Sequence, residues 1–114
     1  MFINVIIFKL FMVLIDKSFI LLEIKKREQE IKEKFHVKHL YLFGSYAKDS
    51  QTENSDIDIL VEFEEGFLDD FSNELDLQVY FYHLFKRDIG LCERSRLRED
   101  YVPYIVNDSL VSIC

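Results

Sequence analysis

The chain has 114 residues, a length that corresponds to one domain with a hydrophobic core of its own. Hydrophobic residues make up 49% and charged residues 31%, with only three glycines and one proline, which excludes a disordered, collagen-like or low-complexity chain. The formal charge of -7 argues against direct binding of nucleic acid, because that affinity depends on Lys and Arg. Cys92 and Cys114 make no disulfide framework, so we expect reduced thiols in a cytoplasmic protein.

Residues 1–17 form an apolar N-terminal extension, and we place the functional domain at residues 18–114. Asn4, Lys9 and Asp16 interrupt the apolar run, which is shorter than the roughly 20 clean residues that span a bilayer. The run also lacks the basic start and the small-residue cleavage site of a signal peptide, so we expect no membrane segment. The sequence leaves open whether the run adds a strand or helix to the core or whether translation starts at Met12.

Hydrophobic patterning predicts alternating helices and strands. Helical spacing predicts a first helix over residues 18–35 with a solvated charged face, and short apolar runs predict strands over residues 40–43 and 57–63. We interpret His36 and His39 as polar residues of a loop and a strand edge. A second helix over about residues 68–85 follows from five apolar residues at helical spacing, Leu68, Phe71, Leu75, Val79 and Tyr82. A strand over residues 88–92 and a helix over about residues 97–106 complete an α/β or α+β domain, a small mixed sheet flanked by helices.

Two aspartates, Asp56 and Asp58, lie two residues apart on the predicted second strand. The period of a strand places both carboxylates on one face, while Ile57 points into the core. Two such carboxylates repel each other unless a cation lies between them, and their hard oxygen donors suit Mg²⁺. Solvent-facing acids on an edge strand would give the same pattern, so the pair alone does not establish a metal site.

Gly44 and Ser45 end the preceding strand, and ten residues separate Ser45 from Asp56. A glycine at a strand end lets the backbone approach a phosphate closely, and a serine hydroxyl with the N–H groups of a following helix start can hold phosphate oxygens. A plain turn with a helix cap is the alternative. Beside the two carboxylates, this loop predicts a nucleoside triphosphate site.

Both motifs together resemble the signature of the minimal nucleotidyltransferases of the DNA polymerase beta superfamily. The residues that carry the resemblance are Gly44-Ser45-Tyr46-Ala47-Lys48 and Ser55-Asp56-Ile57-Asp58-Ile59-Leu60-Val61. The resemblance implies a polymerase-beta-type fold and two-metal nucleotidyl transfer from ATP, with two Mg²⁺ ions. It further implies that Gly44, Ser45 and Lys48 bind the nucleotide.

The family also has a third acid on the next strand, commonly in a hydrophobic-D-L-V pattern. Here the corresponding segment is Arg87-Asp88-Ile89-Gly90-Leu91, and Asp88 is the candidate. The resemblance thus assigns catalysis and metal binding to Asp56, Asp58 and Asp88.

Three residues depart from the family pattern. Lys48 and Asp49 stand where Arg-Gly is usual. Lysine keeps the charge without the planar fork of arginine, and aspartate adopts the left-handed conformation less easily than glycine. Gly90 within the third strand indicates a bulge or a close approach of another backbone.

Small members of this family are typically antitoxins paired with a helical HEPN ribonuclease toxin. The resemblance therefore implies an antitoxin that transfers AMP from ATP to a tyrosine of a cognate HEPN toxin. Two alternatives stay open: a non-catalytic antitoxin that acts by contact, and a small-molecule nucleotidyltransferase that works with a partner subunit. An exposed aromatic patch would mark a protein contact, and its candidate residues, which could equally complete the core, are Phe81, Tyr82, Phe85, Tyr101 and Tyr104.

Overall fold

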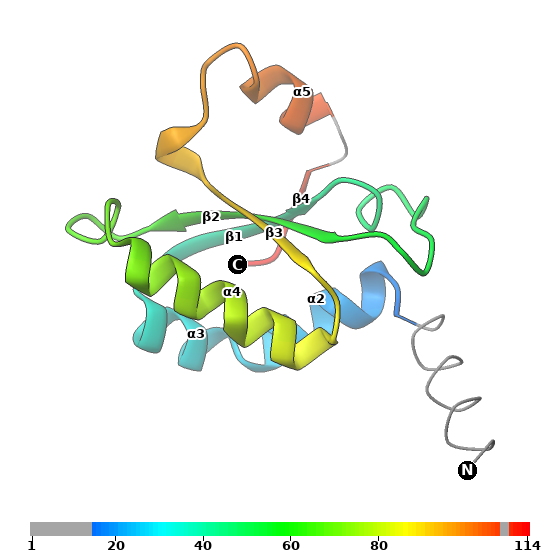
Figure 1. The fold of residues 1–114 in the computed structure, drawn as a ribbon, viewed down its shortest axis with the longest axis horizontal. Helices are drawn as coiled ribbons and strands as arrows, with labels where there is room; N and C mark the ends of the chain where they lie inside the picture. The colour runs from blue at the N-terminus through cyan, green and yellow to red at the C-terminus, as the bar shows by residue number, and fades with distance from the viewer. Residues whose placement is uncertain (1–14, 108–109) are drawn as a thin grey trace.

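The computed structural model describes residues 15–107 and 110–114, which form a four-stranded sheet flanked by helices (Figure 1). In chain order the elements are α2 (Lys17–Lys26), α3 (Glu28–Phe35), β1 (Val37–Phe43), β2 (Ile57–Phe63), α4 (Phe71–Phe85), β3 (Ile89–Glu93), η1 (Arg94–Arg96), α5 (Val102–Asn107) and β4 (Val111–Ser112). The expected class, a small mixed sheet with helices, is confirmed. Most of the expected N-terminal extension lies outside the described residues. None of the helices described is long and apolar enough to cross a membrane.

The strands lie in the order β3-β2-β1-β4. β1 pairs antiparallel with β2 and β4, whereas β2 and β3 are parallel. A parallel pair needs a long crossover connection, and α4 supplies it. A register shift between Val37 and His39 places an extra residue in β1, so that both Val37 and Leu40 are buried although they are three positions apart.

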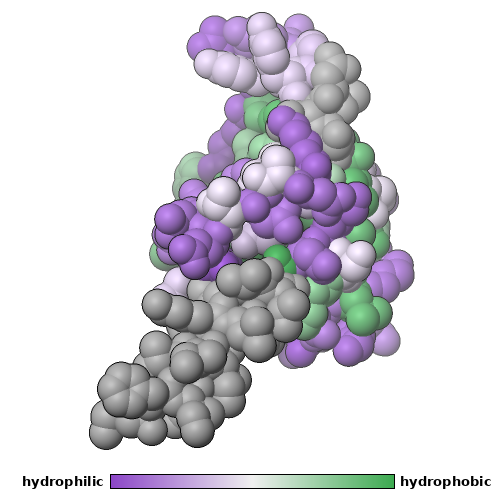
Figure 2. Space-filling view, turned by 90° about the vertical axis from the view of Figure 1, so that its right-hand side faces the viewer, coloured by the Kyte–Doolittle hydropathy of each residue, from purple (hydrophilic) through white to green (hydrophobic). Residues whose placement is uncertain are grey.

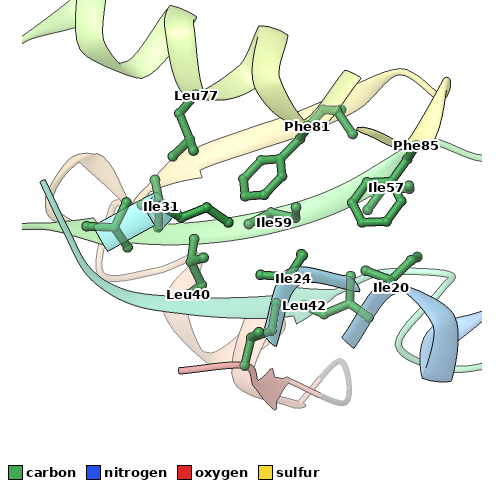
Figure 3. Packing of buried hydrophobic residues seen from close by; sticks show 14 of the residues in the cluster. Ile20, Ile24, Ile31, Leu40, Leu42, Ile57, Ile59, Leu77, Phe81 and Phe85 are labelled. Carbon is green, nitrogen blue, oxygen red and sulfur yellow. The ribbon is translucent and has the colours of Figure 1, made fainter. Parts of the chain in front are cut away.

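The hydrophobic core fills the space between the sheet and helices α2, α3 and α4, which all lie on one side of the sheet (Figure 1). The segment with η1 and α5 lies on the opposite side. Figure 3 shows the packing between α4 and the sheet, where side chains of α4 approach Ile57 and Ile59 of β2 while Ile20 and Ile24 of α2 lie next to them. The alternation along β2 thereby directs its odd-numbered residues toward the helices.

Local capping explains where the helices differ from their predicted bounds. The first helix is interrupted at Arg27, whose φ of -109° is not helical, so that α2 and α3 replace a single helix. α4 begins at Phe71 because the Asp70 side chain accepts a hydrogen bond from the Asn73 N–H at 3.0 Å and caps the helix there.

The C-terminal elements also differ from the prediction. α5 begins at Val102, not near residue 97, because Pro103 has no N–H to donate and is tolerated only in the first turn of a helix. β4 was not predicted. It pairs with β1 through Ser112 opposite Tyr41 and Val111 opposite Leu42.

The buried face of helix α4 is not the face whose apolar spacing predicted the helix. Leu77, Phe81 and Phe85 are its fully buried residues. Four of the five residues whose spacing predicted the helix are exposed by 44–63%, namely Phe71, Leu75, Val79 and Tyr82. Of the five candidate patch residues, Phe81 and Phe85 therefore complete the core, which is the second of the two alternatives left open by the sequence. The other candidates, Tyr82, Tyr101 and Tyr104, are exposed.

The histidines and cysteines occupy ordinary positions in the fold. His36 ends α3 in the left-handed conformation and stacks on the ring of Phe67, and His39 lies in β1 with its Nδ1 3.3 Å from the Cys114 carbonyl oxygen. Cys92 and Cys114 are free thiols. Burial raises the pKa of both thiols, which lowers their reactivity at neutral pH.

Two leucines of α4 offer a matched test of this packing. We expect Leu77→Ala to lower the free energy of unfolding by about 2–5 kcal/mol, because it opens a cavity in the core, and Leu75→Ala to change it by about 0.5 kcal/mol or less. Urea unfolding followed by circular dichroism measures both. Equal losses for the two variants would show that α4 does not pack with Leu77 inward.

Candidate active site

The turn after β1 is anchored in the core. Gly44 has a φ of +77°, in the left-handed region that favours glycine, and Tyr46 and Ala47 are buried two and three residues further on. The helix start expected after Ser45 is not formed. Successive turns take its place, with the Lys48 N–H donating to the Gly44 carbonyl and the Ser50 N–H donating to the Ser45 carbonyl. Ser45 itself is half-buried at the start of these turns.

Asp49 keeps the backbone conformation that glycine usually supplies at this place. Its φ is 57°, so aspartate tolerates the left-handed region here. An ion pair of 3.4 Å between the Lys17 Nζ and the Asp49 Oδ2 ties the turn to α2. The neighbouring Lys48 is exposed, which leaves its side chain at the surface of the turn.

The Asp58 carboxylate lies between two glycines. In the sheet, Asp58 is opposite Phe43 of β1 and Gly90 of β3, and Gly44 follows Phe43 directly. A Cβ at Gly90 would lie 2.5 Å from the Asp58 Oδ1, and a Cβ at Gly44 would overlap the Asp58 Oδ2. The β2–β3 register runs without a shift through Gly90, so the close approach at this glycine is made by the Asp58 side chain and not by a bulge or another backbone.

Asp56 and Asp88 meet at the end of the sheet where β2 and β3 begin. Asp56 precedes β2, Asp88 precedes β3, and the Ile57 N–H donates to the Asp88 carbonyl at 2.9 Å. Both aspartates are exposed and line one polar pocket of about 260 Å³. The other residues of this pocket, none of which the sequence analysis assigned to the active site, are Glu53, Asn54, Ser55, Tyr82, Lys86 and Arg87.

Hydrogen bonds hold the wall of this pocket in place. The Arg87 Nη1 donates to the Glu53 carbonyl at 2.5 Å and so connects the start of β3 to the β1–β2 loop. Lys86 ends α4 in the left-handed conformation, with its N–H donating to the Tyr82 carbonyl at 2.7 Å. Figure 2 looks onto this end of the molecule, where hydrophilic residues cover much of the described surface.

The position of a third acid depends on the strand register. The β3 residue opposite Asp58 is Gly90, which has no carboxylate, while Asp88 lies outside β3. If the family pattern hydrophobic-D-L-V is placed on Ile89-Gly90-Leu91-Cys92, glycine stands at the place of the acid and cysteine at that of valine. Within residues 15–107 and 110–114, no three His, Cys, Asp or Glu side chains form a group that could hold a metal ion. The catalytic role of Asp88 stays a prediction.

Comparison with known proteins identifies the family of the chain. The family model described as nucleotidyltransferase domain matches residues 24–112. A candidate protein adenylyltransferase of Methanocaldococcus jannaschii is 36% identical over 90 residues, which cover 79% of this chain and 90% of that protein. The protein adenylyltransferase MntA of Thermococcus cleftensis is 30% identical over 81 residues, covering 71% of this chain and 80% of that protein.

A solved structure has the same fold. A chain in the structure of tri-AMPylated Shewanella oneidensis HEPN toxin in complex with MNT antitoxin superimposes with a TM-score of 0.59 and 17% identity, covering 82% of this chain and 71% of that chain. The chain belongs to the nucleotidyltransferase domain family and is an enzyme of that class.

The glycine contacts of Asp58 can be tested by a double-mutant cycle. We expect Gly90→Ala to lower the free energy of unfolding by about 1–3 kcal/mol, because the new methyl group overlaps the Asp58 carboxylate. In an Asp58→Ala background, the same substitution should cost little, since the overlap is gone. Denaturant unfolding of the four proteins measures the coupling.

Gly66 provides the control for this cycle. A Cβ there meets no atom within 4 Å, so Gly66→Ala reports only the strain of its φ of +93° and should cost the same in both backgrounds. If Gly90→Ala is equally costly with and without the Asp58 carboxylate, the two residues are not in contact.

Proposed function

We propose that this nucleotidyltransferase is an antitoxin that transfers AMP from ATP to a tyrosine of a cognate HEPN toxin. Its relatives are named protein adenylyltransferases, and a structural neighbour is an antitoxin bound to an AMPylated HEPN toxin. The observation that carries the proposal is the place of the Asp58 carboxylate between Gly44 of the turn after β1 and Gly90 of β3. The turn and a carboxylate are thereby adjacent, as a bound nucleoside triphosphate and its cation require.

In this proposal the turn after β1 binds the triphosphate of ATP. Without a Cβ at Gly44, the phosphates can approach the backbone, and the Ser45 hydroxyl donates to a phosphate oxygen. Lys48 adds a positive charge from the surface of the turn. We expect these contacts to orient the α-phosphate toward the edge of the sheet where Asp56 and Asp88 lie.

The residues present fit Mg²⁺. This ion prefers oxygen ligands and is usually held by one or two carboxylates together with substrate phosphates, so it does not need a preformed group of three acids. Asp56 and Asp58 would hold two such ions, with Asp88 as a further ligand. When bound, Mg²⁺ neutralises charge on the triphosphate and polarises the reacting oxygens.

The reaction is an in-line displacement at the α-phosphorus. The hydroxyl oxygen of the acceptor tyrosine forms a bond to the α-phosphorus of ATP, while the bond to the bridging oxygen of the β-phosphate breaks and pyrophosphate leaves. The hydroxyl proton passes to the Asp88 carboxylate, which lines the pocket that would receive the acceptor. The products are AMP-tyrosine and pyrophosphate, and we expect the reaction in the cytoplasm, where ATP is abundant and Cys92 and Cys114 stay reduced.

One observation favours the alternative of a non-catalytic antitoxin. The residue of β3 that lies opposite Asp58 is Gly90. This position of β3 therefore has no carboxylate, although the family pattern leads us to expect an acid on this strand. An antitoxin that acts only by contact would not need this carboxylate. A small-molecule nucleotidyltransferase that works with a partner subunit has no observation of its own in its favour.

If the antitoxin acts by AMP transfer, the toxin must stay inactive after the antitoxin has been removed. We expect a HEPN toxin treated with this chain, ATP and Mg²⁺ and then separated from it to stay inactive, and to gain the mass of one or more AMP groups on tyrosine. The Asp56→Asn/Asp58→Asn variant should bind the toxin but leave it active after separation, because binding is reversible whereas the phosphodiester persists. Mass spectrometry and a ribonuclease assay give the two readouts. Durable protection by the double variant, with no change in toxin mass, would support the contact-only alternative.

The role of Asp88 has its own test. We expect Asp88→Asn to lower kcat of AMP transfer by about 100-fold or more, as loss of a general base does, while the Kd for ATP changes little. Glu53→Gln removes a carboxylate from the same pocket and is the matched control, with an expected effect of about threefold or less on kcat. Asp88 has no catalytic role if both variants transfer AMP at the same rate.

A further inference from the structure

Helix α4 presents an apolar strip to solvent. Phe71, Leu75, Val79 and Tyr82 follow one another at intervals of four, four and three residues, which places them on one side of the helix. We call these four residues the α4 stripe. Of the seven exposed large hydrophobic residues among those described, four belong to it. A row of this kind on a surface indicates a protein contact, since isolated exposed apolar residues are normal but contiguous ones are not.

The α4 stripe leads directly to the candidate active site. Tyr82, at its C-terminal end, also lines the pocket that contains Asp56 and Asp88. α4 is connected to β3 by a hydrogen bond of 2.8 Å from the Gln78 Nε2 to the Ile89 carbonyl, and β3 is the outermost strand at its end of the sheet order. A protein seated on the stripe would therefore extend over the entrance to this pocket.

We propose that the α4 stripe is the surface on which the acceptor protein docks, and that the acceptor hydroxyl reaches Asp56 and Asp88 past Tyr82. This inference rests on the proposed function, because it names where the substrate protein of that reaction binds. The stripe extends over twelve residues of helix, about 16 Å from Phe71 to Tyr82, which matches roughly three turns of a partner helix. The occupant we infer is an amphipathic helix of the acceptor.

Charges around the stripe determine the chemistry of that helix. Asp69 and Asp70 are exposed immediately before Phe71, and Asp76 is exposed next to Leu75. The chain as a whole carries a formal charge of -7. We therefore infer that Lys or Arg residues flank the apolar face of the acceptor helix. A second copy of this chain would bring the same acids together and is the less favourable occupant.

Three cations near the stripe, Arg27, Lys34 and Arg96, have partners, whereas Lys86 is exposed beyond Tyr82 at the C-terminal end of α4. A groove of about 590 Å³ between α3 and α4 includes Val79, Arg27 and Lys34 in its lining. The Arg27 guanidinium makes a 2.8 Å ion pair with Glu23, and the Lys34 ammonium lies over aromatic rings. At the other end, Arg96 pairs with Glu74 and lies 4.9 Å from the centre of the Phe71 ring. Along the stripe from Phe71 to Val79, the exposed acids Asp69, Asp70 and Asp76 are thus the charges most open to an approaching helix.

The test compares two exposed leucines. Leu75 on α4 and Leu22 on α2 are exposed by 58% and 55%, so neither substitution disturbs the core. The probe is the cognate HEPN toxin of the proposed function, titrated onto the full chain by calorimetry and used as the acceptor in the AMP-transfer assay. We expect Leu75→Lys to raise its Kd and KM by about tenfold or more, because an apolar contact is lost and a positive charge meets the basic flank, with kcat within about twofold of wild type. Leu22→Lys should match wild type in all three constants.

A comparison of two charged substitutions at Leu75 tests whether the docked helix is basic. Leu75→Glu should weaken binding less than Leu75→Lys, since an acid at this position is attracted to a basic helix. The inference is overturned if Leu75→Lys binds the HEPN protein as wild type does, if the Glu variant is the weaker of the two, or if no HEPN binding occurs. It is also overturned if Leu75→Lys only dissolves a homodimer, seen by sedimentation, and leaves HEPN binding unchanged.

Failure of the proposed function has a different signature. If the wild-type chain binds the HEPN protein but transfers no AMP, the enzymatic proposal is refuted. The Kd values of the Leu75 variants would still show whether the α4 stripe is the docking surface. The Kd for ATP serves as the folding control, because the nucleotide turn lies outside the α4 stripe, and it should be unchanged in every variant. The double variant Leu75→Ala/Val79→Ala removes apolar side-chain area without adding charge. We expect this loss of area to be enough to weaken HEPN binding.

Discussion

The parallel pairing of β2 with β3 places Asp58 opposite Gly90, and the turn after β1 places Gly44 against the same carboxylate. Each glycine leaves space that a side chain would take from Asp58. The candidate site therefore depends on three strands being in register: one residue of slip in β3 would replace Gly90 by Ile89 or Leu91. Such a slip would also turn the core side of β3 outward, which the buried Ile89 resists.

The same pairing accounts for the double role of α4. Two parallel strands need a connection that returns along the sheet, and α4 makes this return while it buries Leu77, Phe81 and Phe85. Its C-terminal end must then lie where β3 starts, beside Asp88. The outward side of the helix consequently extends to the candidate pocket, and Tyr82 belongs to both. Core packing and access to the site are coupled through a single helix.

The turn after β1 keeps its geometry although its sequence departs from the family pattern. Asp49 adopts the left-handed conformation that glycine usually provides, and its ion pair with Lys17 fastens the turn to α2. The buried Tyr46 and Ala47 fix the turn from the inside. Conformation is preserved here because the aspartate tolerates a positive φ and because neighbouring contacts hold it there.

The sequence by itself determined the order of the helical and extended segments from α2 to β3, the mixed sheet and the motif from Gly44 to Asp58. These follow from periodicity and from residues close together in the chain, which act locally. Tertiary structure alone decided which face of α4 is buried, because both of its apolar rows have helical spacing and only the sheet selects one. It also decided that Gly90 lies opposite Asp58 while Asp88 lies beyond the strand, since register depends on contacts between distant segments. The two-residue strand β4 has too few residues for a local signal, and it forms only because β1 offers an edge to pair with.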